Sequence, residues 1–192
     1  MPLRACLFSG GESRRMGHDK ALLPHPRGGV WLTALVDQVR LLGLPLQVVS
    51  RHPAHADQLV DRPDVIVVQD PPPWQGPLQA LGHVLPATTA EALLVLPVDM
   101  PRLSAAVLQQ LISAWQQQPD QIAVAMDGQR LQPLLAVIPT GEPFRSRLAE
   151  QLARGERRWM AWLALVPHRP VQLPSQALLN ANRPEDLAAL TS

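Results

Sequence analysis

Glycines and basic side chains crowd together directly after the first apolar segment of the chain, in the stretch from Ser9 to Lys20. Glycines at the end of a strand let backbone N–H groups turn toward an anion, because no side chain stands in the way. Arg14, Arg15 and Lys20 add positive charge and donors that suit phosphate oxygens. These residues predict a loop that binds phosphate groups. An ordinary turn between a strand and a helix, with solvated basic side chains, is the alternative interpretation.

The spacing of the glycines excludes two familiar phosphate-binding loops. The dinucleotide motif Gly-x-Gly-x-x-Gly does not fit, because Gly10 and Gly11 are adjacent. The P-loop motif requires Gly-Lys-Ser/Thr, whereas Lys20 stands between Asp19 and Ala21. A different kind of phosphate loop is therefore indicated.

Asp99 follows a strongly apolar run, Ala92–Leu96, which predicts a buried strand. A carboxylate at this place can hold Mg²⁺, which binds one or two protein carboxylates together with phosphate oxygens and water. The metal would bridge a triphosphate and offset the charge that develops on a leaving pyrophosphate. The other interpretation of Asp99 is a capping residue for the segment near Ser104.

Asp70 occupies a comparable place after the apolar run Val65–Gln69. Its carboxylate can accept hydrogen bonds from N1–H and the exocyclic amine of guanine, or from a ribose. An Asp that initiates a turn before the triple proline Pro71–Pro73 is an equally good interpretation of the sequence.

Strand-like and helix-like segments alternate along the chain. The predicted strands are Ala5–Phe8, Leu46–Val49, Val65–Val68, Ala92–Leu96, Ile122–Met126, Leu134–Ile138, Val171–Leu173 and Leu178–Asn180. The predicted helices are Trp31–Leu42, Pro77–Leu85, Ser104–Gln117, Phe144–Arg154, Arg158–Leu165 and Pro184–Leu190. Val65–Val68 is apolar on both faces, as strands covered by helices on both sides are. Asp127-Gly128 predicts a hairpin turn. The pattern predicts an α/β fold, a single-domain Rossmann-like three-layer architecture over residues 1–192, with a mostly parallel sheet and helices on both faces.

In sheets of this kind, ligands bind beyond the carboxyl ends of the strands. The segment Gly10–Lys20 follows the first predicted strand, Ser50 and Arg51 follow the second, Asp70 the third and Asp99 the fourth. A basic loop, two acids and small polar groups would therefore converge on one edge. The sequence predicts a nucleotide–magnesium site there.

The overall composition argues against several classes of partner. The 192 residues are 46% hydrophobic and 17% charged, as in soluble globular chains, and the net charge of +1 provides no global field for nucleic acid or an anionic membrane. We find no signal peptide and no apolar run near the ~20 residues of a membrane helix. The single cysteine, Cys6, fits a reducing compartment, and we expect it to be a small buried hydrophobe. We therefore expect a cytoplasmic protein.

The six histidines show no metal-ligand spacing, and we interpret all of them as surface or loop residues. They are His18, His25, His52, His55, His83 and His168. None of them is assigned to the predicted site.

The segment from Ser9 to Lys20, followed by Ala21-Leu22-Leu23, contains the pattern Gly-Gly-x-Ser-x-Arg-Met-Gly-x-Asp-Lys. This pattern resembles the signature of nucleotidyltransferases, and in particular of the molybdenum cofactor guanylyltransferase family. The resemblance implies that Arg15 binds the outgoing phosphates, that Lys20 binds the α-phosphate, and that the cofactor Mg²⁺ binds Asp99. The implied catalytic residues are Arg15, Lys20 and Asp99, and the implied nucleotide-binding residues are Phe8, Ser9, Gly10, Gly11, Lys20, Ser50, Asp70 and Asp99.

Two positions depart from the pattern of that family. The family has an asparagine after its second strand, where this chain has Ser50, and it has Gly-Pro-Leu-Ala-Gly where this chain has Gly76–Ala80 with alanine at the end. Serine lacks the two-sided amide pattern that reads guanine. We therefore expect GTP to be preferred, but less strictly than in relatives that keep the asparagine.

The C-terminal half resembles the acceptor side of the family, which implies that the N-terminal half binds nucleotide and the C-terminal half binds pterin. Arg157 and Arg158 suit the phosphate of the pterin, and a solvated surface turn is their alternative interpretation. Asn180 and Asn182 alternate along a predicted strand end and so point to one side. The family has these asparagines near the second substrate and the metal, and the counterpart of Gln132 lies on the acceptor side.

The resemblance implies transfer of GMP from GTP to the terminal phosphate of (molybdo)pterin, with molybdopterin guanine dinucleotide and pyrophosphate as products. It also implies contacts with molybdenum insertion proteins and apo-molybdoenzymes. Two alternatives stay open: a cytidylyltransferase acting on the same pterin or on another phosphorylated acceptor, and a non-catalytic adaptor that delivers the cofactor. The presence of both Lys20 and Asp99 argues against the adaptor.

Overall fold

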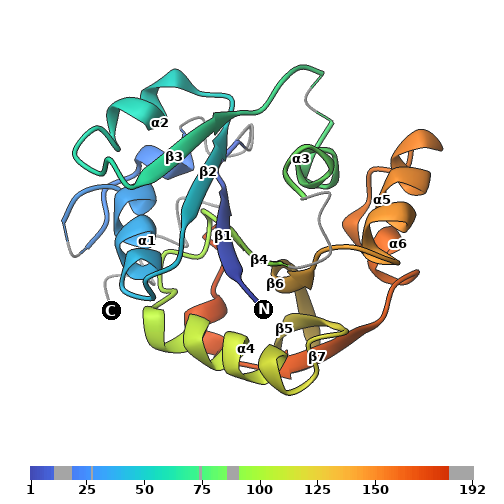
Figure 1. The fold of residues 1–192 in the computed structure, drawn as a ribbon. Coiled ribbons are helices and arrows are strands. Elements are labelled where there is room, and N and C mark those ends of the chain that lie inside the picture. Colours follow the sequence, from blue (N-terminus) through green and yellow to red (C-terminus); the bar gives the residue numbers. More distant parts are fainter. Residues whose placement is uncertain (11–18, 27, 74, 86–90, 182–192) are drawn as a thin grey trace.

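The computed structural model describes residues 1–10, 19–26, 28–73, 75–85 and 91–181. Strands and helices alternate through these residues (Figure 1). The strands are β1 (Leu3–Phe8), β2 (Leu46–Ser50), β3 (Val65–Gln69), β4 (Ala92–Pro97), β5 (Ile122–Asp127), β6 (Arg130–Pro139) and β7 (His168–Gln172). The helices are α1 (Trp31–Arg40), α2 (Pro53–Asp57), α3 (Pro77–Val84), α4 (Ala105–Gln117), α5 (Phe144–Ala153) and α6 (Trp159–Leu163), with single 3-10 turns η1 (Lys20–Leu22) and η2 (Ser175–Leu178).

The strands form one seven-stranded sheet in the order β3-β2-β1-β4-β6-β5-β7. Strands β1 to β4 run parallel, and so do β5 and β7, which confirms the predicted mostly parallel sheet. Strand β6 is the exception, because it pairs antiparallel with both β4 and β5. The predicted hairpin turn at Asp127-Gly128 causes this reversal, with Asp127 paired to Arg130 and Gly128 at a positive φ of 57°.

Helices cover both faces of the sheet, as the three-layer prediction requires. Alternate residues of β4 enter two separate hydrophobic clusters: Leu94 and Leu96 join the first, and Leu93 and Val95 join the second. The first cluster includes apolar residues of α1 and α4, and the second includes residues of α3, α5 and α6. Figure 1 shows α1 and α4 on one side of the sheet, with α3, α5 and α6 on the other.

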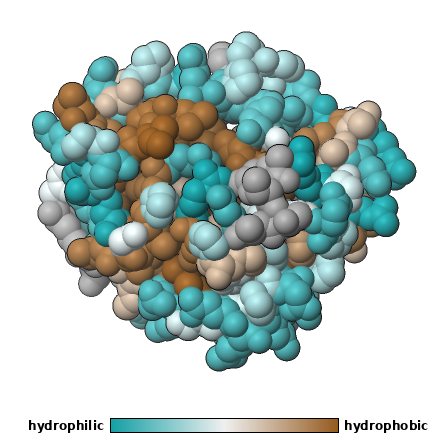
Figure 2. All heavy atoms as spheres, in the orientation of Figure 1, coloured by the Kyte–Doolittle hydropathy of each residue, from teal (hydrophilic) through white to brown (hydrophobic). Residues whose placement is uncertain are grey.

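Strand β3 departs from the prediction for Val65–Val68. We expected a strand buried on both faces, but Ile66 is 65% exposed and none of the five strand residues is fully buried. The physical reason is that β3 is the last strand of the sheet and has β2 as its only neighbour. Val65 and Val67 pack against the first hydrophobic cluster, whereas the other face stays open. Figure 2 shows apolar atoms gathered over the region that β3 occupies in Figure 1.

Several smaller predictions were also wrong or incomplete. Leu178–Asn180 was expected to be a short strand, but the chain forms the 3-10 turn η2 at Ser175–Leu178 and then continues without pairing. Helix α2 was not predicted, because its five residues are too short to show a helical period. The predicted helix Pro184–Leu190 lies outside the described residues. Within the part of the chain that is described, no helix is long and apolar enough to cross a membrane.

Candidate active site

The carboxyl ends of four parallel strands meet along one edge of the sheet, and most of the predicted site residues lie there. Backbone hydrogen bonds continue the strand pairing one step past the strands: Ser9 N–H donates to Val49 O at 3.0 Å, and Asp70 N–H donates to Ser50 O at 2.9 Å. On the other side of β1, Val98 N–H donates to Phe8 O at 3.1 Å. Ser9, Ser50, Asp70 and Asp99 are therefore brought to the same edge, as predicted from the order of the strands.

Lys20 and Asp99 face each other at this edge. The Nζ atom of Lys20 lies 3.9 Å from the Oδ2 atom of Asp99, and their side chains are 14% and 28% exposed. Burial raises the pKa of the Asp99 carboxyl above its ordinary value, although the charge of Lys20 acts in the opposite direction. Lys20 is the only lysine in the whole sequence. The site thus contains a carboxylate, Asp99, that is partly buried and whose negative charge is stabilised by the nearby Lys20 ammonium.

The residues around Asp99 fit a magnesium ion that is held mainly by its substrate. No group of three or more His, Cys, Asp or Glu side chains is placed to hold a metal among the residues described here. A site with a single carboxylate matches Mg²⁺, which keeps several waters and takes further oxygens from phosphates. Asp99 lies two residues after the end of β4 and 3.9 Å from Lys20, the last residue of the segment predicted to bind phosphate.

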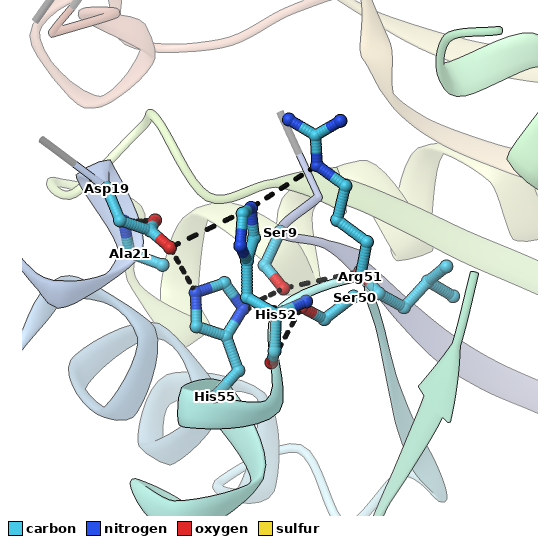
Figure 3. Close-up of polar contacts among 8 residues, drawn as sticks. Ser9, Asp19, Ala21, Ser50, Arg51, His52 and His55 are labelled. Carbon is cyan, nitrogen blue, oxygen red and sulfur yellow. Dashed lines mark hydrogen bonds and ion pairs between the residues drawn. The ribbon is translucent and has the colours of Figure 1, made fainter. Parts of the chain in front are cut away.

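A buried hydrogen-bonded network lies beside this pair (Figure 3). The imidazole of His55, on α2, is fully buried and lies between Asp19 and the ends of β1 and β2. Its Nε2 atom is 2.8 Å from Asp19 Oδ2, and its Nδ1 atom is 2.7 Å from Ser50 Oγ and 3.1 Å from Ser9 Oγ. The expectation that all histidines are surface or loop residues was therefore wrong for His55. His25 does lie in a loop, as expected, but it is only 9% exposed and places Nε2 3.1 Å from Pro101 O in the loop after Asp99.

The hydroxyl of Ser50 points into this network. It accepts a hydrogen bond from His52 N–H at 2.9 Å and is also bonded to His55, and Ser50 is only 3% exposed. Ser50 stands where the family has its base-reading asparagine, and its hydroxyl is thus hydrogen-bonded within the protein. Sequence reasoning placed Ser50 at the correct edge but could not show the direction of its hydroxyl.

Two acids in the site have distinct electrostatic surroundings. Burial alone would raise the pKa of Asp19, but the interactions with His55, the backbone N–H of Ala21 and His52 together outweigh it, so the pKa lies below its ordinary value. Asp70, at the end of β3, places Oδ1 3.2 Å from Nδ1 of His83, and Nε2 of His83 lies 3.2 Å from the amide nitrogen of Gln79. His83 and Gln79 belong to α3, so this helix supports the predicted base- or ribose-binding carboxylate.

The predicted acceptor-side residue Asn180 lies close to the backbone of Asp99. Its Nδ2 atom donates to Gln132 Oε1 at 3.2 Å, which joins the two acceptor-side candidates directly. The next residue, Ala181, donates its backbone N–H to Asp99 O at 3.0 Å. The structure therefore brings Asn180, Gln132 and Asp99 together, although they lie far apart in the sequence.

The two predicted pterin-binding arginines have different surroundings. The guanidinium of Arg157 donates to Gln75 Oε1 and to two backbone carbonyl oxygens, so it ties the start of α6 to the loop before α3. Arg158 is 81% exposed and pairs with Glu156 at 2.7 Å. Hydrogen bonds from Arg158 and from the backbone lower the pKa of Glu156 to about 2. Arg157 is thus held in place by protein groups, whereas Arg158 extends into solvent.

The remaining predicted residues complete the comparison. Phe8 lies beneath the edge and packs its ring against Trp159, with centroids 6.2 Å apart. Gly10 ends the first described stretch, next to the backbone of Arg51. Gly11, Arg15 and Asn182 lie outside the described residues. His55 was missed because two of its partners, Asp19 and Ser9, stand 36 and 46 positions away, so no local pattern could show the network.

The chain resembles known proteins over most of its length. The family described as MobA-like NTP transferase domain matches residues 5–169. A probable molybdenum cofactor guanylyltransferase from Rhodopirellula baltica is 36% identical, with 97% of this chain and 90% of the relative covered. The molybdenum cofactor guanylyltransferase of Pseudomonas syringae pv. syringae is 32% identical, with 95% and 92% covered.

A solved structure has the same fold. The molybdopterin-guanine dinucleotide biosynthesis protein A from Archaeoglobus fulgidus superposes with a TM-score of 0.76 at 19% identity, over 98% of this chain and 96% of that one. The family model and the sequence relatives identify the family. The chain belongs to the molybdenum cofactor guanylyltransferase family of nucleotidyltransferases.

Proposed function

We propose that this enzyme transfers GMP from GTP to the terminal phosphate of molybdopterin, and that it requires Mg²⁺. The observation that carries the proposal is the Lys20–Asp99 pair at the carboxyl edge of β1 and β4. Lys20 is the last residue of the signature segment, Ser9–Lys20. In the reaction, an oxygen of the pterin phosphate attacks the α-phosphorus of GTP. The bond from that phosphorus to the bridging oxygen breaks, and its electron pair leaves with pyrophosphate. The products are molybdopterin guanine dinucleotide and pyrophosphate.

The two substrates supply the nucleophile and the leaving group, so the protein contributes positioning and charge stabilisation. Lys20 binds the α-phosphate, where negative charge must be neutralised during transfer. Arg15 binds the outgoing phosphates. Asp99 holds Mg²⁺, which when bound offsets the charge of the triphosphate. Burial of Asp99 beside Lys20 supports this division of roles, because electrostatic interactions are stronger where water is excluded.

The acceptor side of the site consists of the C-terminal residues. Asn180 and Gln132 lie next to Asp99 through the Ala181 hydrogen bond, which supports a pterin phosphate close to the metal. Asn182 and the exposed Arg158 are proposed to bind the pterin, and Arg157 lines the junction between the two halves. We propose further that molybdenum insertion proteins and apo-molybdoenzymes exchange the cofactor with this enzyme.

A cytidylyltransferase is the second candidate, and one observation favours it. The hydroxyl of Ser50 is used by His55 and His52, so the position that carries a base-reading amide in the family offers no comparable group here. Asp70 can still accept from both guanine donors, and we therefore keep GTP as the proposed substrate. The adaptor hypothesis is disfavoured, because binding alone does not require a lysine beside a desolvated carboxylate.

The test is a nucleotide panel with purified enzyme and molybdopterin. GTP, CTP and ATP are supplied separately, with and without Mg²⁺, and pyrophosphate release is measured while mass spectrometry identifies the product. The proposal expects pyrophosphate and the guanine dinucleotide with GTP and Mg²⁺. A cytosine dinucleotide as main product would establish the cytidylyltransferase, and binding without any pyrophosphate would establish the adaptor.

A further inference from the structure

One buried ring holds both ends of the signature segment. Ser9 is the first residue of that segment and Asp19 is the residue before Lys20, and His55 contacts both, through Nδ1 at 3.1 Å and Nε2 at 2.8 Å. The same Nδ1 atom lies 2.7 Å from Ser50 Oγ at the end of β2. Figure 3 shows the ring between the carboxylate on one side and the two serines on the other. His55 therefore links the two ends of the segment to each other and to the sheet edge.

When the His55 ring carries a single proton, the chemistry of its partners decides which nitrogen holds it. A carboxylate only accepts hydrogen bonds, so the Nε2 atom of His55 donates to Asp19. The Nδ1 atom is then an acceptor and receives the proton of the Ser50 hydroxyl, which in turn accepts from His52 N–H. The hydroxyl of Ser9 lies 3.2 Å from Val49 O and 3.1 Å from Nδ1 of His55, and its proton can be donated to either acceptor. Each polar group has a partner of the correct type, as a buried network requires.

From Asp19 the network continues to Lys20. The second carboxylate oxygen of Asp19 accepts the backbone N–H of Ala21 at 3.0 Å and caps the 3-10 turn η1. Lys20 is the first residue of this turn, and its Nζ atom lies 3.9 Å from Asp99. Asp19 thus ties the orientation of the His55 ring to the backbone that carries the lysine.

The place of the network in the fold argues against a purely structural role. His55 is 0% exposed, and Ser9 and Ser50 are 2% and 3% exposed, so these polar groups lie where apolar residues would pack without needing partners. The two serines lie at the carboxyl ends of β1 and β2, the edge at which the sequence predicts ligand binding. A helix of only five residues, α2, presents the ring.

We propose that His55 is a positioning residue of the transferase site: it holds Ser9 and Asp19 in register and thereby sets Lys20 for the α-phosphate. The inference rests on the proposed function of Lys20 and deepens it. His55 itself does not touch the substrate. Loss of its link to Asp19 should lower kcat while leaving the binding of GTP nearly unchanged, because the lysine acts on charge that develops during transfer.

Two substitutions separate the two sides of the ring. The amide of His55→Asn reaches the position of Nδ1, toward the serines, whereas the longer amide of His55→Gln reaches that of Nε2, toward Asp19. We expect His55→Asn to lower kcat roughly 10- to 100-fold with less than a threefold change in KM for GTP, the usual range for a displaced catalytic group. His55→Gln should recover most of that loss. Thr140→Val is the matched control, because Thr140 is a buried, hydrogen-bonded side chain at the opposite edge of the sheet.

A second background tests the connection to Lys20. In Lys20→Ala enzyme there is no amine to position, so adding His55→Asn should change kcat by about threefold or less. If the two losses multiply in full, His55 acts elsewhere and the proposal is overturned. Asp19→Ala, which removes the same link from the other side, replaces His55→Asn if that variant does not fold.

A spectroscopic measurement makes the test independent of turnover. Reductive methylation with ¹³C labels only Lys20 and the N-terminal amine, since the chain has a single lysine. Without any substrate, the Lys20 methyl resonance should move in His55→Asn, return toward its wild-type position in His55→Gln and stay in place in Thr140→Val. A resonance that is unchanged in folded His55→Asn would overturn the proposal even if GTP proves to be the wrong nucleotide. Conversely, inactive wild-type enzyme with the expected resonance changes would count against the proposed function alone.

Discussion

The backbone N–H of Ala181 donates to the carbonyl oxygen of Asp99 at 3.0 Å and so ties the acceptor side of the chain to the residue proposed to hold the metal. Asn180 stands next to this bond with its amide on Gln132. This hydrogen bond holds the proposed acceptor-side residues close to the residue proposed to bind the metal. It is a physical basis for placing the pterin phosphate against the α-phosphorus.

Asn180→Ala is expected to raise KM for molybdopterin while KM for GTP stays within about twofold of wild type, because the amide lies on the acceptor side of Asp99. Steady-state kinetics with each substrate varied in turn will measure both constants. Gln109→Ala, on the exposed face of α4, is a suitable control. A larger effect on GTP than on the pterin would reverse the proposed assignment of the two sides.

Lys20→Ala should lower kcat/KM by roughly 10²-fold or more, because the lysine is proposed to stabilise charge that appears in the transition state. Lys20→Arg keeps the charge but replaces a compact ammonium by a planar fork, so only partial recovery is expected. Pyrophosphate release at saturating pterin is the measurement, with circular dichroism to confirm folding. Near-normal turnover in folded Lys20→Ala would remove the residue from the mechanism.

Asp99→Asn should keep the fold and sharply raise the Mg²⁺ concentration needed for half-maximal activity. The amide retains a single neutral oxygen, which is a weaker ligand for a hard cation. Burial already disfavours the charged carboxyl, so this substitution should not lower thermal stability. Activity is titrated against Mg²⁺ in both proteins. The same metal dependence in variant and wild type would return Asp99 to a capping role.

Base selection should follow Asp70 rather than Ser50. With GTP, CTP and ATP in competition, we expect GTP to be preferred, with discrimination roughly tenfold weaker than in relatives that keep the asparagine, the scale of one lost hydrogen-bonding group. Asp70→Asn should abolish most of the preference, because an amide cannot accept from both guanine donors. The product ratio is read by mass spectrometry. A clear preference of the wild type for CTP would identify it as a cytidylyltransferase.

Stability should fall at alkaline pH because of Cys6. Burial raises the pKa of this thiol to about 12 in the folded state, whereas the pKa of an unfolded cysteine is about 8.5. Above the lower value the unfolded chain holds fewer protons than the folded one, so the free energy of unfolding decreases by up to about 1.4 kcal/mol per pH unit. Below the pKa of the unfolded cysteine, the contribution of the thiol to the free energy of unfolding is fully present.

Urea unfolding between pH 7.5 and 10 measures this slope. The chain has no tyrosine and one lysine, so few other groups titrate in the interval. Cys6→Ala provides the comparison: it should shift the whole curve by its cavity cost and remove the slope assigned to the thiol. An identical slope in the two proteins would show that the thiol is not responsible.

The sequence alone determined the architecture and the edge at which the site forms. Apolar runs of strand length alternate with amphipathic segments along the chain. The arrangement that buries the apolar residues of both is a sheet between two layers of helices. The parallel order then brings the residues after Phe8, Val49, Gln69 and Pro97 to one edge, which is why Ser9, Ser50, Asp70 and Asp99 could be assigned from their positions.

Only the tertiary structure decided which polar side chains face one another. Strand β3 became an exposed edge because nothing further paired with it, and β6 reversed because a two-residue turn left no room for a crossover. His55 lies on a five-residue helix, and its partners Ser9 and Asp19 are dozens of positions away, so its burial depends on how distant segments pack. A local pattern carries the propensity of a segment, whereas the direction and partners of a side chain come from packing between distant segments.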